Sequence, residues 1–354
     1  MNKRYKLYIF LLLLPLLGHS NYLEAAFVKT KNIKKAYYVN LDAGINIDNS
    51  YGNITVTTWD EDKIELDINI KVSGSNEVWV NQRINEIDVD INALKHLVSA
   101  KTILGNTNYK AKGNNNSFEI NYSIKIPKKG NVTIRNKYGA ISTNDLWATT
   151  DLYCKYGKIT TGKLYGGKNT ILIEYCPGST IEYINYGAIT ARYSGLRVES
   201  LSRIDLVSDY TDVTILEGDN IKYTSKYGNL EVNNVKSIEG TANYMTLKFG
   251  EINGQLKLNA KYCEINIDSL NARMNDLSII SGYSNIKIGY NAAYAFDFDI
   301  AVRYANFKHE NNLVFSNREE TNFSKTFQGY HLKKGINNFI IKSDYGNINL
   351  TKKY

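Results

Sequence analysis

Residue types that commonly carry out catalysis are scarce and scattered in this sequence. Beyond the N-terminal region, histidine occurs at three widely separated positions, His96, His309 and His331, and no metal-binding or nucleophile motif surrounds them. Two pairs of acids have a spacing that acid–base chemistry could use: Asp88 and Asp90, and Asp297 and Asp299. That spacing also places each pair on one face of an extended strand, where carboxylates are solvated. We therefore predict no catalytic site, no metal site and no cofactor.

The three cysteines are the other candidates for reactive side chains. An odd cysteine count in an exported protein can mark a reactive thiol. Cys176 and Cys263 occupy the same position after a repeated tyrosine. They lie about five repeats apart, roughly 24 Å at 4.8 Å per repeat, which is too far for a disulfide. Cys154 is offset from Cys176 along the strand direction. We interpret all three as small core residues.

A tyrosine, a small residue and an alternating apolar pair recur along the chain, as in SKYGNLEV and SDYGNINL. Successive copies are 17–21 residues apart, and a gap of 41 residues precedes the final copy. A nearly fixed period of this length is typical of repeat proteins, in which each unit buries its apolar face against its neighbours. The repeated tyrosines are Tyr138, Tyr156, Tyr175, Tyr193, Tyr210, Tyr227, Tyr244, Tyr262, Tyr283, Tyr304 and Tyr345.

Apolar residues alternate around each tyrosine, and this alternation predicts strands. The residues on the same face as Tyr227 are Ile221, Tyr223 and Ser225. After the tyrosine the phase slips by one residue, to Leu230 and Val232, so the chain must turn a corner. We place the corner on the two residues after the tyrosine, often Gly-Asn. This interpretation predicts that the tyrosine rings point inward and form a ladder with a spacing of about 4.8 Å.

The repeats predict an all-β fold, a parallel β-solenoid of about 11–12 coils over residues 131–354. A right-handed coil is expected because parallel crossovers are overwhelmingly right-handed. Residues 316–335 read as a long polar loop within it. The segment 26–130 differs, because it holds one copy of the repeat around Tyr51, longer strands and a helical apolar spacing over residues 76–87. We interpret it as a small mixed β/α cap, with one short helix, over the open N-terminal end of the solenoid.

The first 20 residues have the composition of a signal peptide, with Lys3, Arg4 and Lys6 before an apolar run from Leu7 to Leu17. That run is shorter than the roughly 20 residues of a membrane-spanning helix, and no second apolar stretch follows. The sequence therefore predicts export to a periplasm, an outer membrane or the cell exterior. Removing the three basic residues lowers the net charge from +8 to +5. This mild charge gives no indication of nucleic-acid binding.

Charged residues also recur immediately before the tyrosines. Their signs alternate from Lys155 through Glu174, Arg192 and Asp209 to Lys226, which predicts a structural charge ladder between adjacent strands. The same line continues to Lys261 and Arg303 without an acid in the repeats between them. We interpret Lys261 and Arg303 as a candidate anion-binding strip.

Three stretches carry a family resemblance: NSYGNITVTTWDEDKIELDINIKVSG, SFEINYSIKIPKKGNVTIRNKYG and the serial tyrosine repeats. With these, the chain resembles the exported bacterial β-solenoid proteins called "putative adhesins", a family otherwise described as a domain of unknown function. The resemblance covers nearly all of the chain after the signal peptide. It implies an envelope or surface protein and supplies no catalytic residues.

The predicted function is therefore that of an exported, non-enzymatic, adhesin-like protein that binds a glycan or protein ligand along one flank. Two alternatives remain at this point. One is a polysaccharide lyase or hydrolase, because many parallel β-helices are such enzymes. The other is a purely structural envelope or stress-response protein.

Overall fold

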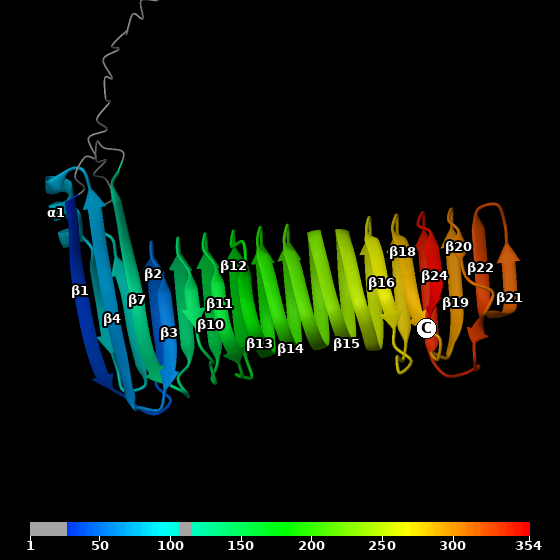
Figure 1. The fold of residues 1–354 in the computed structure, drawn as a ribbon, viewed down its shortest axis with the longest axis horizontal. Helices are drawn as coiled ribbons and strands as arrows, with labels where there is room; N and C mark the ends of the chain where they lie inside the picture. The colour runs from blue at the N-terminus through cyan, green and yellow to red at the C-terminus, as the bar shows by residue number, and fades with distance from the viewer. Residues whose placement is uncertain (1–26, 106–114) are drawn as a thin grey trace, which may run out of the picture.

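The computed structural model describes residues 27–105 and 115–354, and this part of the chain is almost wholly made of strands. It contains 24 strands and one helix, and all the strands join in a single sheet. The strands follow one another in a long row from β1 (Phe27–Tyr38) to β21 (Val314–Glu320) (Figure 1). The predicted all-β class is confirmed. The predicted signal peptide lies outside the described residues.

Each repeat forms two strands that meet at a corner marked by the repeated tyrosine. Strands before the corner pair in parallel with those of the neighbouring repeats, and strands after the corner do the same. Strands before the corner are β2 (Gly44–Ser50), β8 (Val132–Lys137), β10 (Thr150–Lys155), β12 (Asn169–Glu174), β17 (Leu277–Gly282), β19 (Phe296–Arg303) and β23 (Asn338–Asp344). Strands after it are β3 (Ile54–Trp59), β9 (Ile141–Thr143), β11 (Ile159–Leu164), β16 (Glu264–Leu270), β18 (Asn285–Asn291), β20 (Phe307–Lys308) and β24 (Ile348–Lys353). In the middle of the row the strands are longer: β13 (Ser179–Arg192) and β14 (Gly195–Asp209) each span the stretch between two tyrosine corners, and β15 (Asp212–Lys261) continues through the corners at Tyr227 and Tyr244.

Alternating side chains from both strand sets fill the interior between them. In the repeat around Tyr227, Ile221, Tyr223 and Ser225 are buried before the corner, and Leu230 and Val232 are buried after it. The same alternation places a continuous line of Ile, Leu and Val in the core along the whole row. The inward positions predicted from the period of two, other than the tyrosine itself, are therefore confirmed in this repeat.

The tyrosine itself makes the corner. All twelve repeated tyrosines, from Tyr51 to Tyr345, have a φ angle between 49° and 63°. This left-handed conformation costs an L-residue roughly 1–2 kcal/mol and is rare for a bulky side chain. The sequence had placed the corner on the following two residues, and that placement is wrong.

The residues after the tyrosine fit the close stacking of the corners. A Cβ added to Gly139 would lie 1.9 Å from the carbonyl oxygen of Gly52 in the adjacent corner, so a side chain has no room there. The asparagine after the glycine joins neighbouring corners, because Asn53 Oδ1 accepts a hydrogen bond of 2.8 Å from the backbone N–H of Ala140. These residues hold one repeat on the next.

The N-terminal region adds antiparallel strands to this row. β1 pairs with β4 (Lys63–Gly74), and β4 pairs with β7 (Ser117–Pro127), which in turn lies parallel to β3. β5 (Asp88–Ala93) pairs with β6 (Leu97–Ile103), which lies parallel to β2. The predicted short helix is present as α1 (Glu77–Glu86), and the side chain of Asn76 caps its first turn. The repeat around Tyr51 continues the row directly, since β2 also pairs in parallel with β8.

The order of the repeats changes near the far end. β23 lies between β17 and β19 and pairs in parallel with both, although it follows both in the chain. β24 likewise lies between β18 and β20 (Figure 1). The unit that contains Tyr345 is thus inserted between two units formed by earlier residues.

The segment 316–335 is not the long polar loop that the sequence predicts. It contributes most of an antiparallel hairpin, β21 with β22 (Ser324–His331), and β22 also pairs with β19. The hairpin covers the side of β19 that β23 leaves open. Its polar residues are exposed because it lies at the outer end of the row, which explains why its composition resembles that of a loop.

Candidate functional site

The repeated tyrosines form one continuous stack of rings, which we call the tyrosine ladder. Neighbouring ring centroids are 4.6–5.1 Å apart, and the ring planes differ by 3°–19°. In spatial order the ladder consists of Tyr51, Tyr138, Tyr156, Tyr175, Tyr193, Tyr210, Tyr227, Tyr244, Tyr262, Tyr283, Tyr345 and Tyr304. The copy of the repeat around Tyr51 was identified from the sequence, but the predicted ladder did not include Tyr51, because a long insertion separates it from the other repeats.

The ladder faces solvent and not the core, so the predicted inward orientation is wrong. Its side chains are between 39% and 53% exposed. Strand alternation alone would point each ring inward, but the left-handed φ angle of the tyrosine rotates its side chain to the outside. The next residue, for example Cys176 or Thr211, is buried, and the alternation of buried and exposed side chains continues from there along the strand after the corner.

A tilted phenylalanine closes each end of the ladder. Phe118 lies 4.9 Å from Tyr51 at an interplanar angle of 56°, and Phe323 lies 5.5 Å from Tyr304 at 47°. Ring faces inside the ladder are covered by their neighbours. The surface offered to solvent therefore consists of ring edges and phenolic hydroxyls, which can both donate and accept hydrogen bonds.

The ladder hydroxyls are not used to hold the fold together. In the part of the chain that the structure describes, the tyrosine hydroxyls that bond to protein groups belong to other residues, such as Tyr153, Tyr290 and Tyr294. Because neighbouring rings are nearly parallel and their centroids are about 5 Å apart, the ladder hydroxyls form a regular row.

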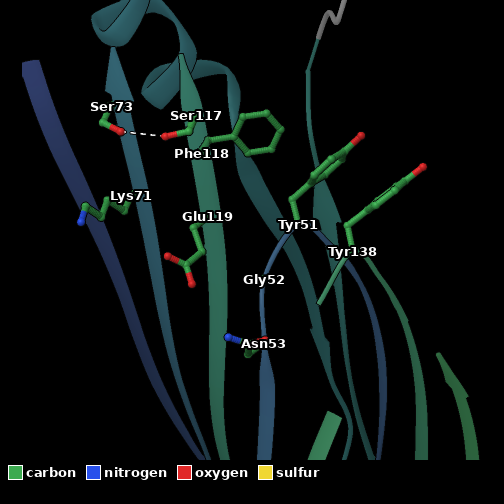
Figure 2. A pocket seen from close by; sticks show the side chains of 9 residues that line it. All are labelled: Tyr51, Gly52, Asn53, Lys71, Ser73, Ser117, Phe118, Glu119 and Tyr138. Carbon is green, nitrogen blue, oxygen red and sulfur yellow. Dashed lines mark hydrogen bonds between the residues drawn. The ribbon is translucent and has the colours of Figure 1, made fainter. Parts of the chain in front are cut away.

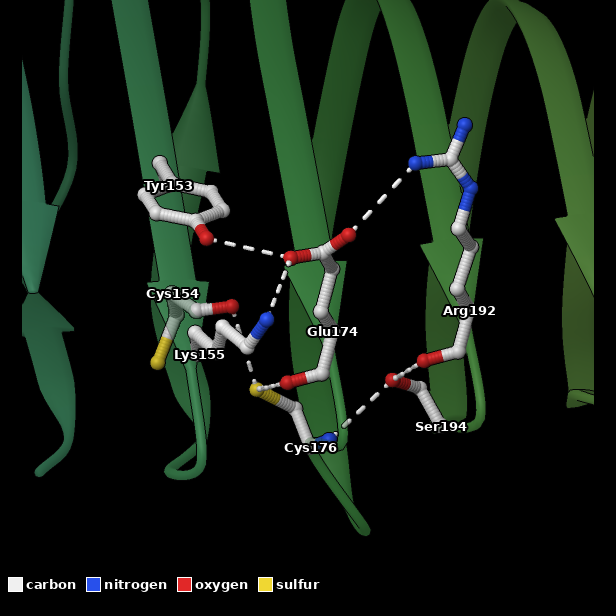
Figure 3. A network of polar contacts seen from close by, with 7 residues as sticks. All are labelled: Tyr153, Cys154, Lys155, Glu174, Cys176, Arg192 and Ser194. Carbon is white, nitrogen blue, oxygen red and sulfur yellow. Dashed lines mark hydrogen bonds and ion pairs between the residues drawn. The ribbon is translucent and has the colours of Figure 1, made fainter. Parts of the chain in front are cut away.

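A polar network joins three adjacent strands, β10, β12 and β13 (Figure 3). Its residues Lys155, Glu174 and Arg192 each directly precede a ladder tyrosine. The carboxylate of Glu174 accepts a hydrogen bond of 3.0 Å from Tyr153 Oη and lies 3.5 Å from Lys155 Nζ and 3.4 Å from Arg192 Nη1. Desolvation would raise the pKa of Glu174, but Tyr153, Lys155 and Arg192 together lower that pKa below its usual 4.5. This part of the alternating line therefore forms ion pairs, as expected for a structural charge ladder.

The structure does not bring Lys261 and Arg303 together. In the strand register, Lys261 is next to Gly282, Gly282 is next to Asp344, and Asp344 is next to Arg303. Arg303 donates to both carboxylate oxygens of Asp344. The inserted unit thus places an acid inside the candidate anion-binding strip, which the chain order could not show.

Three of the other candidate chemical groups, Asp88, Asp297 and His331, contact groups of the protein itself. Asp88 pairs with Lys31 at 3.0 Å, and Asp297 accepts the backbone N–H of Gly335. His331 is buried, and its Nδ1 lies 2.7 Å from the carbonyl oxygen of Tyr294. The three cysteines are buried and free. In residues 27–105 and 115–354, no group of three or more His, Cys, Asp or Glu side chains is arranged to hold a metal ion.

A cleft of about 450 Å³ lies at the Phe118 end of the ladder (Figure 2). β4, β7 and the first two ladder corners line it, with Lys71, Ser73, Ser117 and Glu119 beside the aromatic rings. The sequence offered no signal for this cleft, because it depends on how the antiparallel strands β4 and β7 are placed against the first repeat.

Comparison with solved structures gives several similar chains. A "putative adhesin" from Bacteroides fragilis is 16% identical, covers 90% of this chain and 97% of its own, and has a TM-score of 0.26. A "putative adhesin" from Parabacteroides distasonis is 9% identical, with coverages of 91% and 97% and a TM-score of 0.33. A "putative lipid binding protein" from the same organism is also 9% identical, with coverages of 90% and 96% and a TM-score of 0.32. Two of these three structures carry the adhesin description of the family that the sequence motifs resemble.

Other comparisons add no relative. No family model and no curated protein matches the chain. Among the described residues, no helix has the length and apolar character needed to cross a membrane.

Proposed function

We propose that the protein is an exported, non-enzymatic surface protein that binds an extended polysaccharide along the tyrosine ladder. In this proposal the parallel units form a right-handed β-solenoid, and the N-terminal strands and α1 act as its cap. The signal-like N-terminus supports export. The burial of the three cysteines and the protein contacts of His331, Asp88 and Asp297 support a function without catalysis.

The observation that carries the proposal is that tyrosine occupies every corner, although the left-handed backbone conformation there is strained for a tyrosine. Glycine would adopt the left-handed conformation without steric cost, and asparagine would do so more easily than tyrosine. Tyrosine nevertheless occupies this position twelve times, and each ring is directed to solvent. Strain of this kind is often retained at functional sites.

The shape of the ladder favours a linear polysaccharide over a folded protein. The ladder is a narrow, regular line of hydroxyls and ring edges, whereas a stable protein interface buries about 800 Å² on each partner. A polysaccharide presents hydroxyl groups and C–H edges along its length. It can therefore bond repeatedly to a row of groups that both donate and accept.

The test compares ladder variants in polysaccharide affinity gels and pull-downs. Replacing Tyr193, Tyr210 and Tyr227 together by Phe keeps the ring stack and removes three hydroxyls. We expect polysaccharide binding to fall at least about tenfold, because each lost hydrogen bond contributes about 0.5–1.5 kcal/mol. A second variant with Asn at the same positions tolerates the left-handed corner and removes the rings.

The matched control changes three side chains of the same repeats, Thr190, Val207 and Thr224, to Ala. These lie three residues before the ladder tyrosines on the adjoining strands, and binding should be unchanged. Unaltered binding by both folded ladder variants would overturn the proposal, as would retention of a protein but of no polysaccharide. Release of new reducing ends from the polysaccharide would favour the enzyme alternative.

A further inference from the structure

The cleft at the Phe118 end of the ladder has the size and lining of a small-molecule site. Its volume of about 450 Å³ falls in the range of ligand pockets, about 300–1,000 Å³. Figure 2 shows Tyr51, Tyr138 and Phe118 on one side of it and Lys71 and Glu119 on the other. The ladder stops here because Phe118 is tilted and does not continue the parallel stack.

The aromatic wall of the cleft is held in place from behind. The Arg83 guanidinium lies over the ring of Phe118 at 4.5 Å, and Arg83 Nη1 donates to the carbonyl oxygen of Leu104 at 2.7 Å. Arg83 is itself buried. Because Phe118 is packed in this way, its position does not depend on a ligand, which reduces the entropy lost on binding.

The polar wall supplies both donors and acceptors. Lys71 and Glu119 are directly opposite each other on β4 and β7, and both are exposed. No ion pair between them is present in the described residues. The hydroxyls of Ser73 and Ser117, which also line the cleft, are 2.8 Å apart. The Asn53 Oδ1 atom is used by the neighbouring corner, and this leaves the amide NH₂ group of Asn53 as a further donor.

We propose that this cleft binds one sugar ring of a neutral glycan, with the ring against Phe118 and Tyr51 and its hydroxyls bonded to Glu119, Lys71 and Asn53. A neutral sugar fits because the opposite charges of Lys71 and Glu119 leave the polar wall without net charge. The inference rests on the proposed function, since the cleft is then the end of the ladder's binding surface, where a chain end would lie.

The experiment is isothermal titration of the full chain with neutral disaccharides of glucose, galactose and mannose, and with disaccharides that carry a uronic acid. At least one neutral disaccharide should bind. Glu119→Gln should weaken that binding about tenfold, because it removes a charged acceptor from an exposed position without altering the core. Phe118→Leu should weaken it as well. Glu231→Gln, on an exposed position of β15 away from the cleft, is the control and should bind as the wild type does.

Three results would overturn the inference: no neutral disaccharide binds, uronic-acid disaccharides alone bind, or Glu119→Gln binds as tightly as the wild type. The two proposals fail separately. The triple Phe variant of the mid-ladder should lose long polysaccharide and keep the disaccharide. Glu119→Gln should lose the disaccharide and keep most binding to long polysaccharide.

Discussion

The left-handed corner predicts which of two substitutions at Tyr227, to alanine or to glycine, destabilises the protein more. Tyr227→Ala removes ring contacts with Tyr210 at 4.6 Å and Tyr244 at 5.1 Å. Each stacked aromatic pair contributes about 0.5–1.5 kcal/mol, so this variant should lose about 1–3 kcal/mol of unfolding free energy. A ring enclosed in the core would cost more, about 3–5 kcal/mol.

Tyr227→Gly removes the same ring and also relieves the backbone. The φ angle of Tyr227 is 54°, and an L-residue there costs roughly 1–2 kcal/mol more than glycine. Glycine loses about 0.5–1 kcal/mol through its greater freedom in the unfolded chain. The glycine variant should therefore be more stable than the alanine variant, by about 0.5–1 kcal/mol.

Guanidinium unfolding measures both variants, with the change in midpoint at constant slope as the readout. Thr224 is the control, because it is exposed on the strand just before the same corner. At Thr224 glycine should be less stable than alanine, which is the usual order in a strand. The same order at Tyr227, or a loss for Tyr227→Ala equal to that for the buried Leu230→Ala, would contradict the corner described here.

Three further predictions follow from other contacts. Gly139→Ala should destabilise the protein by about 1–3 kcal/mol, because its Cβ would meet Gly52. Gly167→Ala should be nearly neutral, because nothing lies within 4 Å of its added Cβ. Thermal unfolding of the two variants distinguishes these outcomes. Because the pKa of Glu174 is lowered in the folded state, its stabilising contribution is present above pH 4.5 and is lost as the pH falls through the lower folded value. The stability difference between wild type and Glu174→Gln should therefore shrink in acid, and a difference that is constant from pH 7 to pH 3 would refute this. The three buried cysteines should react with a thiol reagent at the rate of unfolding, and fast labelling of the native protein would show that one of them is accessible.

Local patterns predicted the strands well. The alternation of Ile221, Tyr223 and Ser225 identified the buried face, because neighbouring extended residues must point to opposite sides. The spacing of apolar residues identified α1, and its N-cap Asn76 is a residue type that favours helix starts. The stacking of the repeated tyrosines followed from the spacing between neighbouring strands.

The orientation of the tyrosines could not be read in the same way. Alternation assigns a face only while the backbone stays extended, and a single left-handed residue reverses the face without changing the spacing. The glycine after Tyr227 led the sequence-based prediction to place the corner one residue too late, although the left-handed residue common to all the repeats is the tyrosine. That glycine is required by its own positive φ angle of 146° and by close contact with the neighbouring corner, as its Cβ would lie 2.3 Å from the carbonyl oxygen of Thr211.

Long-range pairing explains the other differences. The hairpin β21–β22 lies in a polar stretch, and its strands are fixed by pairing with β19 and not by an apolar pattern. The gap of 41 residues before Tyr345 showed that the repeat was interrupted, but not that the next unit lies between two earlier ones. The cleft beside Phe118 depends on residues from segments separated by more than 40 positions, Lys71 and Glu119 among them.

The inserted unit also restricts the order in which this protein can assemble. A simple row of repeats can grow one unit at a time as the chain is made or secreted, since each new unit docks on the one before it. Here β19 and β17 reach their final neighbours only when β23 is available to lie between them. Until then, two unpaired strand edges remain open, and each can recruit the wrong segment. The far end of the row must therefore close in a single late step, which makes it the part most exposed to misassembly during vectorial synthesis.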